Sequence, residues 1–104
     1  MIDQRSYYVY VLLCADGTYY TGYSANPIAR FAEHMKGQGA RYTRTHKPME
    51  IVHLERFRTQ RAAMRRERAI KNLTHIQKRK LTDTTNQAPL LLENVIQLSS
   101  TGVS

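Results

Sequence analysis

Apolar residues near the start of the chain form two short runs that are rich in aromatic and β-branched side chains. Residues 7–14, YYVYVLLC, are apolar on both alternating faces, which predicts a central strand of a sheet. Residues 18–23, TYYTGY, predict a second strand, and Ala-Asp-Gly at 15–17 predicts the turn between the two. Residues 51–57 predict a third strand, although two polar residues weaken its alternation.

The length of the hairpin turn decides which tyrosines share a face of the sheet. A two-residue Asp-Gly turn is one option, and a three-residue loop with Gly17 in the left-handed conformation is the other. In the three-residue loop Tyr10 faces Gly22 and Leu12 faces Tyr20, so both tyrosines lie on one face. In the two-residue turn they lie on opposite faces, because a one-residue slip exchanges the faces. The residue pattern leaves both registers open.

Helical signals follow the hairpin. Asparagine and proline at 26–27 are typical of a helix start and glycine at 37 is typical of a stop, which predicts a helix over about residues 27–36. Arg30 and His34 are one turn apart and lie outside the apolar stripe of this helix. The stripe itself is formed by four residues: Ile28, Phe31, Ala32 and Met35.

The second half of the chain begins with a glycine-rich basic loop, GQGARYTRTHKPM, at residues 37–49. After the third strand, two further helices are predicted over about 60–73 and 75–83. Beyond this point the composition changes, since residues 84–104 contain no Lys or Arg. We therefore predict one domain over residues 1–83 and a C-terminal tail over 84–104, which is either a short helix around Leu90 to Leu98 or disordered.

The chain is strongly basic. Its 104 residues hold 16 Lys and Arg against 8 Asp and Glu, a net charge of +8, which favours a polyanionic partner, with nucleic acid ahead of anionic membrane. Cys14 has no second cysteine to pair with, which indicates a buried thiol in a reducing compartment. No stretch approaches the length of a membrane span and the first residues do not resemble a signal peptide, so we expect a cytoplasmic protein that does not enter a membrane.

One acidic residue stands alone in a basic segment. Residues 56–80 carry ten basic residues and a single acid, Glu67, which the helical period places at the border of the apolar side. An exposed ion pair with Lys71 is one explanation, and it is worth only ~0.3–0.5 kcal/mol. The other is a carboxylate that holds a metal ion against a phosphate, which suits a groove lined with basic residues.

The order and spacing of these residues resemble the GIY-YIG endonuclease superfamily, and most closely its small stand-alone bacterial members. Tyr8-Val9-Tyr10 stands where the family name has Gly-Ile-Tyr, and Tyr20-Thr21-Gly22 stands where it has Tyr-Ile-Gly. The GxGARYT loop and the AAMRRERAIKNLT helix also resemble the stand-alone group. The resemblance covers about residues 7–83. It implies an α+β fold, a three-stranded antiparallel sheet flanked by helices in the order ββαβαα, and it selects the three-residue hairpin loop.

The resemblance also implies a catalytic site made of Tyr10, Tyr20, Arg30, His34 and Glu67. In this assignment Glu67 holds Mg²⁺ or Mn²⁺, Arg30 neutralises charge on the phosphate, and Tyr10 is the general base, hydrogen-bonded to His34. A free phenol titrates near ~10, so nearby cationic groups and the metal must lower the pKa of Tyr10, or the cleavage rate will be low. An asparagine that many family members carry after the glutamate has no counterpart here, where Lys78, Arg79 and Lys80 occupy that region.

The predicted activity is metal-dependent hydrolysis of phosphodiester bonds in DNA, without a choice between single-stranded, duplex and branched substrates. Seven residues are candidates for contacting the nucleic acid: Tyr23, Arg41, Arg44, Lys47, Arg65, Arg68 and Lys71. The first alternative is a non-catalytic module that binds nucleic acid through the same basic surface and stacks tyrosines on bases. The second is an adaptor that binds a partner through its tail.

Overall fold

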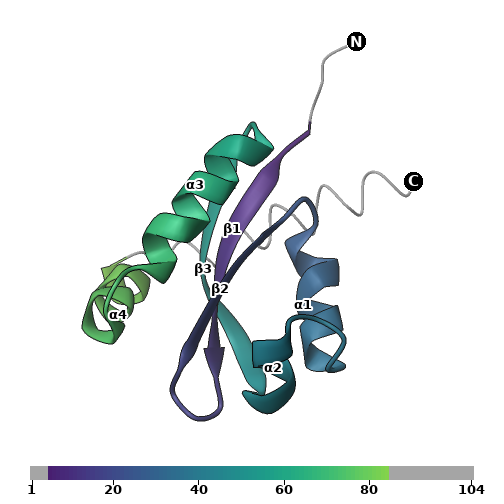
Figure 1. Cartoon of the computed structure of the whole chain (residues 1–104), viewed down its shortest axis with the longest axis vertical. Helices are drawn as coiled ribbons and strands as arrows, with labels where there is room; N and C mark the ends of the chain where they lie inside the picture. Colours follow the sequence, from purple (N-terminus) through teal and green to yellow (C-terminus); the bar gives the residue numbers. More distant parts are fainter. Residues whose placement is uncertain (1–4, 85–104) are drawn as a thin grey trace.

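The computed structural model describes residues 5–84, which form a three-stranded antiparallel sheet and four helices (Figure 1). The elements in chain order are β1 (Tyr7–Cys14), β2 (Tyr19–Ser24), α1 (Pro27–Met35), α2 (Arg41–Thr45), β3 (Pro48–Phe57), α3 (Gln60–Lys71) and α4 (His75–Thr84). The strands lie in the order β2-β1-β3, so β1 is central and β2 is an edge strand. The predicted α+β fold class is confirmed, and α2 is an addition to the predicted order because it lies within the expected loop.

The hairpin between β1 and β2 has the three-residue loop. Gly17 has a φ of 82°, and the amide of Cys14 donates a hydrogen bond to the carbonyl of Thr18 at 2.9 Å. The Asp16 carboxylate fixes the turn by accepting hydrogen bonds from the amide and the hydroxyl of Thr18, at 3.1 and 2.6 Å. Tyr10 therefore pairs with Gly22, and the prediction that Tyr10 shares a face with Tyr20 is confirmed.

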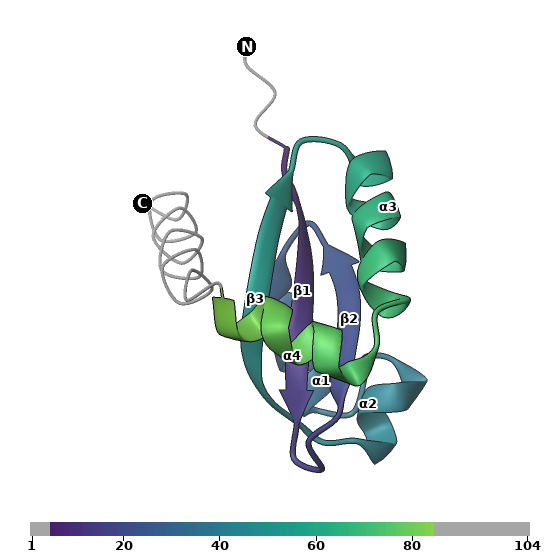
Figure 2. The ribbon, with the colours of Figure 1, turned by 90° about the vertical axis from the view of Figure 1, so that its left-hand side faces the viewer.

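Helices cover both faces of the sheet, which explains why β1 is apolar on both sides (Figures 1 and 2). On one face α1 packs against a core of Tyr8, Tyr10, Leu12 and Leu54. On the other face α3 packs, and Leu81 of α4 joins the same core, which consists of Val9, Val11, Ala63 and Ile70. Cys14 is a buried free thiol, as predicted.

The predicted apolar stripe of α1 is wrong about which of two neighbouring residues is buried, and this matters for the site. His34 was expected outside the apolar stripe, but its side chain is only 1% exposed, whereas Met35 of the expected stripe is 46% exposed. A buried imidazole is tolerated when both ring nitrogens have hydrogen-bond partners, and His34 has two. The segment that follows α1 supplies one of these partners and covers the ring.

The short helix α2 is anchored by aromatic contacts. The ring of Tyr42 stacks on Tyr20, with centroids 5.9 Å apart, and on His46, at 4.0 Å. His46 Nδ1 lies 2.5 Å from the carboxylate of Asp16 in the hairpin turn. A five-residue helix is too short to be stable by itself or to show a hydrophobic period, so tertiary contacts hold it in place.

Most of the predicted tail lies outside the described residues, including the expected helix around Leu90 to Leu98. Thr84 is the exception, since it ends α4. A search of residues 5–84 for a helix long and apolar enough to cross a membrane found none.

Candidate active site

Tyr10 lies at the centre of the candidate site. It projects from the central strand towards α1 and is 2% exposed. Its hydroxyl lies over the backbone of Gly22 in the edge strand, where an added Cβ would be 2.5 Å from the phenol oxygen. The absence of a side chain at Gly22 therefore gives the Tyr10 hydroxyl its space. Tyr20 lies two residues before Gly22 on β2, and its ring centroid is 6.4 Å from that of Tyr10.

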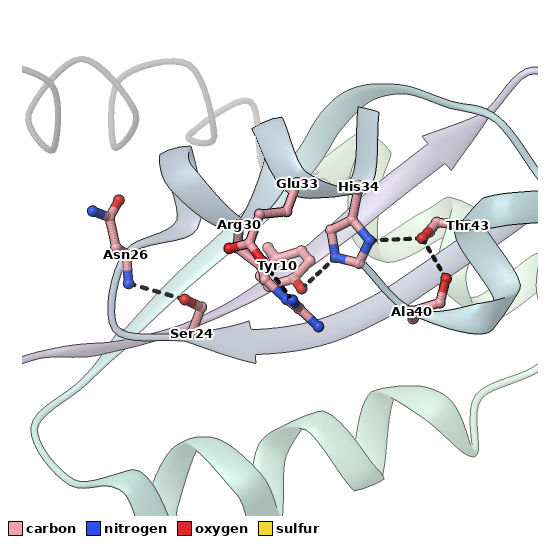
Figure 3. Close-up of polar contacts among 8 residues, drawn as sticks. All are labelled: Tyr10, Ser24, Asn26, Arg30, Glu33, His34, Ala40 and Thr43. Carbon is pink, nitrogen blue, oxygen red and sulfur yellow. Dashed lines mark hydrogen bonds and ion pairs between the residues drawn. The ribbon is translucent and has the colours of Figure 1, made fainter. Parts of the chain in front are cut away.

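His34 connects Tyr10 to the loop and helix that follow α1 (Figure 3). Its Nε2 is 2.9 Å from the phenol oxygen of Tyr10, and its Nδ1 is 2.7 Å from the hydroxyl oxygen of Thr43. The Thr43 hydroxyl in turn donates to the backbone carbonyl of Ala40 at 3.0 Å. Gly39 permits this close cover, because a Cβ there would be 2.2 Å from His34 Nδ1.

Arg30 provides the positive charge at the site. It lies one turn before His34 on α1, where its guanidinium donates to the carboxylate of Glu33 at 3.2 Å (Figure 3). A hydrogen bond and a charge interaction with Arg30 both act to lower the pKa of Tyr10. The guanidinium side chain is 33% exposed, so one cationic group beside the buried phenol remains in contact with solvent.

Burial outweighs Arg30 in setting the protonation of Tyr10. Desolvation raises the pKa of Tyr10 well above its ordinary value, and the neighbouring Tyr20 adds to this. Burial also raises the pKa of Tyr20. The pKa of His34 moves down, because burial and the charge of Arg30 both disfavour the imidazolium. At neutral pH Tyr10 and His34 are therefore a hydrogen-bonded pair of neutral groups, and within the protein alone the cation beside Tyr10 does not lower its pKa below the ordinary value.

Glu67 reaches the site from α3, on the other layer of the molecule. Its carboxylate is only 19% exposed and lies 3.5 Å from the ammonium of Lys71, so the predicted ion pair is present. Glu67 nevertheless lies close enough to both site tyrosines for its charge to raise their pKa values. Because β2 is an edge strand, side chains from α1 and from α3 can approach each other around it.

The donor set around Glu67 fits a lightly held divalent ion. Within residues 5–84 there is no group of three or more His, Cys, Asp and Glu side chains that could enclose a metal. Mg²⁺ is commonly bound through one or two carboxylates while water and substrate phosphates complete its shell, so a single carboxylate beside a phosphate site is compatible with it. Glu67 is the residue that would hold such an ion.

Six of the seven residues predicted to contact nucleic acid lie in two groups, and Tyr23 lies apart from them. Arg41 and Arg44 on α2 and Lys47 after it are exposed on the side of α1. The exposed residues of the second group lie on α3: Arg65, Arg68 and Lys71. Tyr23 packs with the core under α3, and its hydroxyl accepts a hydrogen bond from Gln60 at 3.2 Å.

Gly39 and Thr43 belong to this site but were not predicted from the sequence. Both lie in the glycine-rich segment whose GxGARYT motif was noted without a role for its residues. The signal in the sequence was a glycine followed four residues later by a threonine, in the segment after a histidine that lies outside the apolar stripe of its helix. It became interpretable only once His34 was found buried.

A small sheet that brings Tyr10 of the central strand and Tyr20 of the edge strand to one face is the arrangement of a nuclease-type domain. The GIY-YIG catalytic domain family matches residues 6–80, and the chain belongs to this family. Members of the family are nucleases that act on nucleic acids, generally with a divalent metal.

Within the family, the similar proteins are small ones named UPF0213. A UPF0213 protein of Natronomonas pharaonis is 55% identical over 75 residues, which is 72% of this chain and 88% of the relative. One from Enterococcus faecalis is 44% identical over 86 residues, 81% of this chain and 98% of the relative. A solution NMR structure of an E. faecalis protein matches with a TM-score of 0.54 at 41% identity, covering 81% of this chain and 90% of that one. The UPF0213 structure from Bacillus halodurans matches with a TM-score of 0.52 at 36% identity, covering 80% and 88%.

Proposed function

We propose that this protein is a divalent-metal-dependent endonuclease that hydrolyses phosphodiester bonds in DNA. The observation that carries the proposal is the hydrogen bond between the buried Tyr10 hydroxyl and Nε2 of His34, beside the partly exposed guanidinium of Arg30. A phenol paired with an unprotonated imidazole is equipped to remove a proton from water. A guanidinium at the same place is suited to a phosphate that gains charge during the attack.

Each site residue has a distinct role in this proposal. Tyr10 is the general base and His34 is its hydrogen-bond partner. Arg30 stabilises the charge that develops on the phosphate, and Tyr20, on the same sheet face as Tyr10, orients the phosphate or the attacking water. Glu67 holds the divalent ion, Mg²⁺ or Mn²⁺, which supplies Lewis-acid stabilisation of charge on the phosphate oxygens.

Two exposed basic groups support a nucleic-acid substrate. Four arginines of α2 and α3 are exposed, and the chain has 16 Lys and Arg against only 8 Asp and Glu. They are Arg41, Arg44, Arg65 and Arg68. Such groups bind the phosphate backbone without reading the bases, so weak sequence preference is expected. We therefore favour substrates defined by shape, either single-stranded or branched DNA.

The decisive assay measures cleavage of labelled single-stranded, duplex and branched DNA with Mg²⁺, with Mn²⁺ and with chelator. Glu67→Gln keeps the size of the side chain and removes its charge. We expect metal-dependent cleavage to fall by about 10²-fold or more, because Lewis-acid stabilisation is worth several kcal/mol, while DNA binding persists. Glu50→Gln, at an exposed position on β3, is the matched control and should cleave at the wild-type rate.

The same assay separates this proposal from a non-catalytic binding module. Binding with no cleavage under any metal condition would favour the module. The binding surface can be tested separately with Arg65→Ala, which should weaken DNA binding. Arg79→Ala on α4 removes the same charge from a residue paired with Asp83 and should leave binding nearly unchanged.

A further inference from the structure

Thr43 is buried against His34 in a segment to which the proposed reaction gives no role. It is 2% exposed, although it belongs to a helix of only five residues on the surface of the fold. Its hydroxyl oxygen is 2.7 Å from His34 Nδ1 and 3.0 Å from the carbonyl oxygen of Ala40 (Figure 3). One hydroxyl therefore lies between a histidine nitrogen and a backbone acceptor.

The position of each proton in this chain follows from the chemistry of the groups. A carbonyl oxygen can only accept, so the contact with Ala40 requires the single hydroxyl proton of Thr43. With its proton used there, the Thr43 oxygen can only accept from His34, and Nδ1 must carry a proton. In a neutral imidazole the other nitrogen, Nε2, is then an acceptor, and it faces the hydroxyl of Tyr10 at 2.9 Å.

We propose that Thr43 is a positioning residue that holds His34 in the Nδ1-protonated tautomer, so that Nε2 is kept free to receive the proton of Tyr10. This inference rests on the proposed nuclease function for its catalytic consequence, whereas the tautomer itself is a property of the protein alone. Gly39 assists by letting the loop backbone lie against the ring without a side chain.

The consequence for the reaction is a two-step proton relay. As water attacks the phosphorus, one of its O–H bonds breaks and the proton goes to the oxygen of Tyr10. The original proton of Tyr10 passes to His34 Nε2, so a new O–H bond and a new N–H bond replace the two that break. The leaving oxygen takes a proton from solvent water. His34 then returns its extra proton to the oxygen of Tyr10, and the Tyr10 hydroxyl passes its own proton to the hydroxide so formed.

This relay removes the need for a free tyrosinate. Burial holds the pKa of Tyr10 above its ordinary value, so an isolated phenolate is scarce at neutral pH. When His34 becomes an imidazolium, both of its N–H groups keep acceptors, one on Tyr10 and one on Thr43. Thr43 can donate its hydroxyl proton to the Ala40 carbonyl throughout, and its oxygen accepts a hydrogen bond from Nδ1 in both protonation states of His34.

The charged and titratable groups around His34 are compatible with this direction of transfer. On α1 itself, Arg30 disfavours the imidazolium and Glu33 favours it. From the sheet, Tyr10 and Tyr20 present neutral rings, the latter with its centroid 5.1 Å from the imidazole. Helix α2 presents the uncharged hydroxyl of Thr43. His34 is thus neutral before the reaction and receives one proton during it.

The first test reads the tautomer directly and does not depend on activity. In ¹⁵N-labelled wild-type protein at neutral pH, two-bond ¹H–¹⁵N correlation spectra of the imidazoles distinguish a protonated nitrogen from an unprotonated one. We expect His34 to show a protonated Nδ1 and an unprotonated Nε2. Because this measurement needs no variant, it cannot fail through misfolding. An unprotonated Nδ1 with a protonated Nε2 would overturn the proposal.

The second test uses variants that separate the hydroxyl from the packing. Thr43→Val keeps the shape of the side chain and should release His34 into a mixture of tautomers while lowering the cleavage rate by about 10–100-fold, the usual effect of losing a histidine's orienting partner. Thr43→Ser retains the hydroxyl and should restore most of the rate. Thr45→Val is the control, since the exposed Thr45 likewise donates its hydroxyl to a carbonyl three residues earlier, that of Tyr42.

The outcomes of the two tests are distinguishable from failure of the nuclease proposal. If no DNA is cleaved under any condition, the nuclease proposal fails while the spectra still decide the tautomer. If DNA is cleaved and Thr43→Val cleaves at the wild-type rate, the positioning role is refuted and the nuclease proposal stands. Loss of rate in Thr43→Val with an unchanged His34 tautomer would also refute it.

Discussion

Gly22 gives the sharpest steric test of where the Tyr10 hydroxyl lies. In Gly22→Ala the new Cβ would be 2.5 Å from the phenol oxygen and 2.7 Å from the adjacent ring carbon. Ordinary carbon contacts lie at about 3.5–4.0 Å, so the phenol must move by roughly 1 Å. Tyr10 has little room to move, since it is 2% exposed and held by His34. A displacement of this size at a reacting group costs about 10²-fold in rate, and overpacking a core costs about 1–3 kcal/mol of stability.

The assay for Gly22→Ala combines single-turnover DNA cleavage with thermal unfolding. We expect a cleavage rate lower by about 10²-fold and a melting temperature lower by several degrees, because about 1 kcal/mol corresponds to 4–8 °C for a domain of this size. Tyr10→Phe/Gly22→Ala should cleave no more slowly than Tyr10→Phe alone, since the hydroxyl that Gly22 positions is already missing. Its melting temperature should still fall, because the ring carbon 2.7 Å from the new Cβ must shift. A single variant Gly22→Ala that folds and cleaves at the wild-type rate would refute the reasoning.

Three further predictions concern pH and salt. Hydrogen bonds from His53 and Arg66 lower the pKa of Glu55 from 4.5 to about 2 despite its partial burial. The ionised carboxylate therefore contributes fully to the free energy of unfolding above pH 4.5, and roughly 3 kcal/mol of that stability is lost as pH falls towards 2. Denaturant unfolding at pH 7 and 3 should show a weaker pH dependence in Glu55→Gln than in wild type. The cleavage rate should rise as His34 loses its proton and stay level above about pH 6.5, because its pKa is lowered; a rate that still climbs between about pH 7 and 9 would indicate a freely ionising Tyr10. If about five phosphates on a single strand are neutralised, log K for DNA binding should fall with log salt at a slope of about −3.5, and a flat dependence in a filter-binding titration would contradict the role given to the basic surface.

The parts of the fold that sequence predicted well are those with local signals. The apolar run of β1, the Asn26 cap with Pro27, and Thr59 before α3 each specify an element from neighbouring residues alone, and the structure has these elements at nearly the predicted bounds. The residue pattern alone did not predict that Tyr10 and Tyr20 share a face, because one residue more or less in the hairpin loop exchanges the faces of a strand. The family resemblance selected the loop that Gly17 adopts.

The parts that sequence did not predict depend on contacts between distant residues. The residue pattern placed His34 outside the apolar stripe of its helix, and the family resemblance placed it beside Tyr10, but neither indicated its nearly complete burial. That burial is favourable only because partners on β1 and α2 satisfy both ring nitrogens. Helix α2 has too few residues for a periodic pattern, and its position depends on rings from Tyr20, Tyr42 and His46. The role of Thr43 could not be seen before either of these facts was known.

The central claim is that Tyr10 moves a proton in the cleavage of DNA, and one comparison tests it most directly. Single-turnover cleavage with Mn²⁺ is measured for wild type, for Tyr10→Phe and for Tyr19→Phe, whose ring packs on the opposite face of the sheet. DNA affinity is measured alongside. We predict that Tyr10→Phe binds as wild type does but cleaves at least about 10²-fold more slowly, while Tyr19→Phe cleaves normally. Equal rates for Tyr10→Phe and wild type would contradict the account.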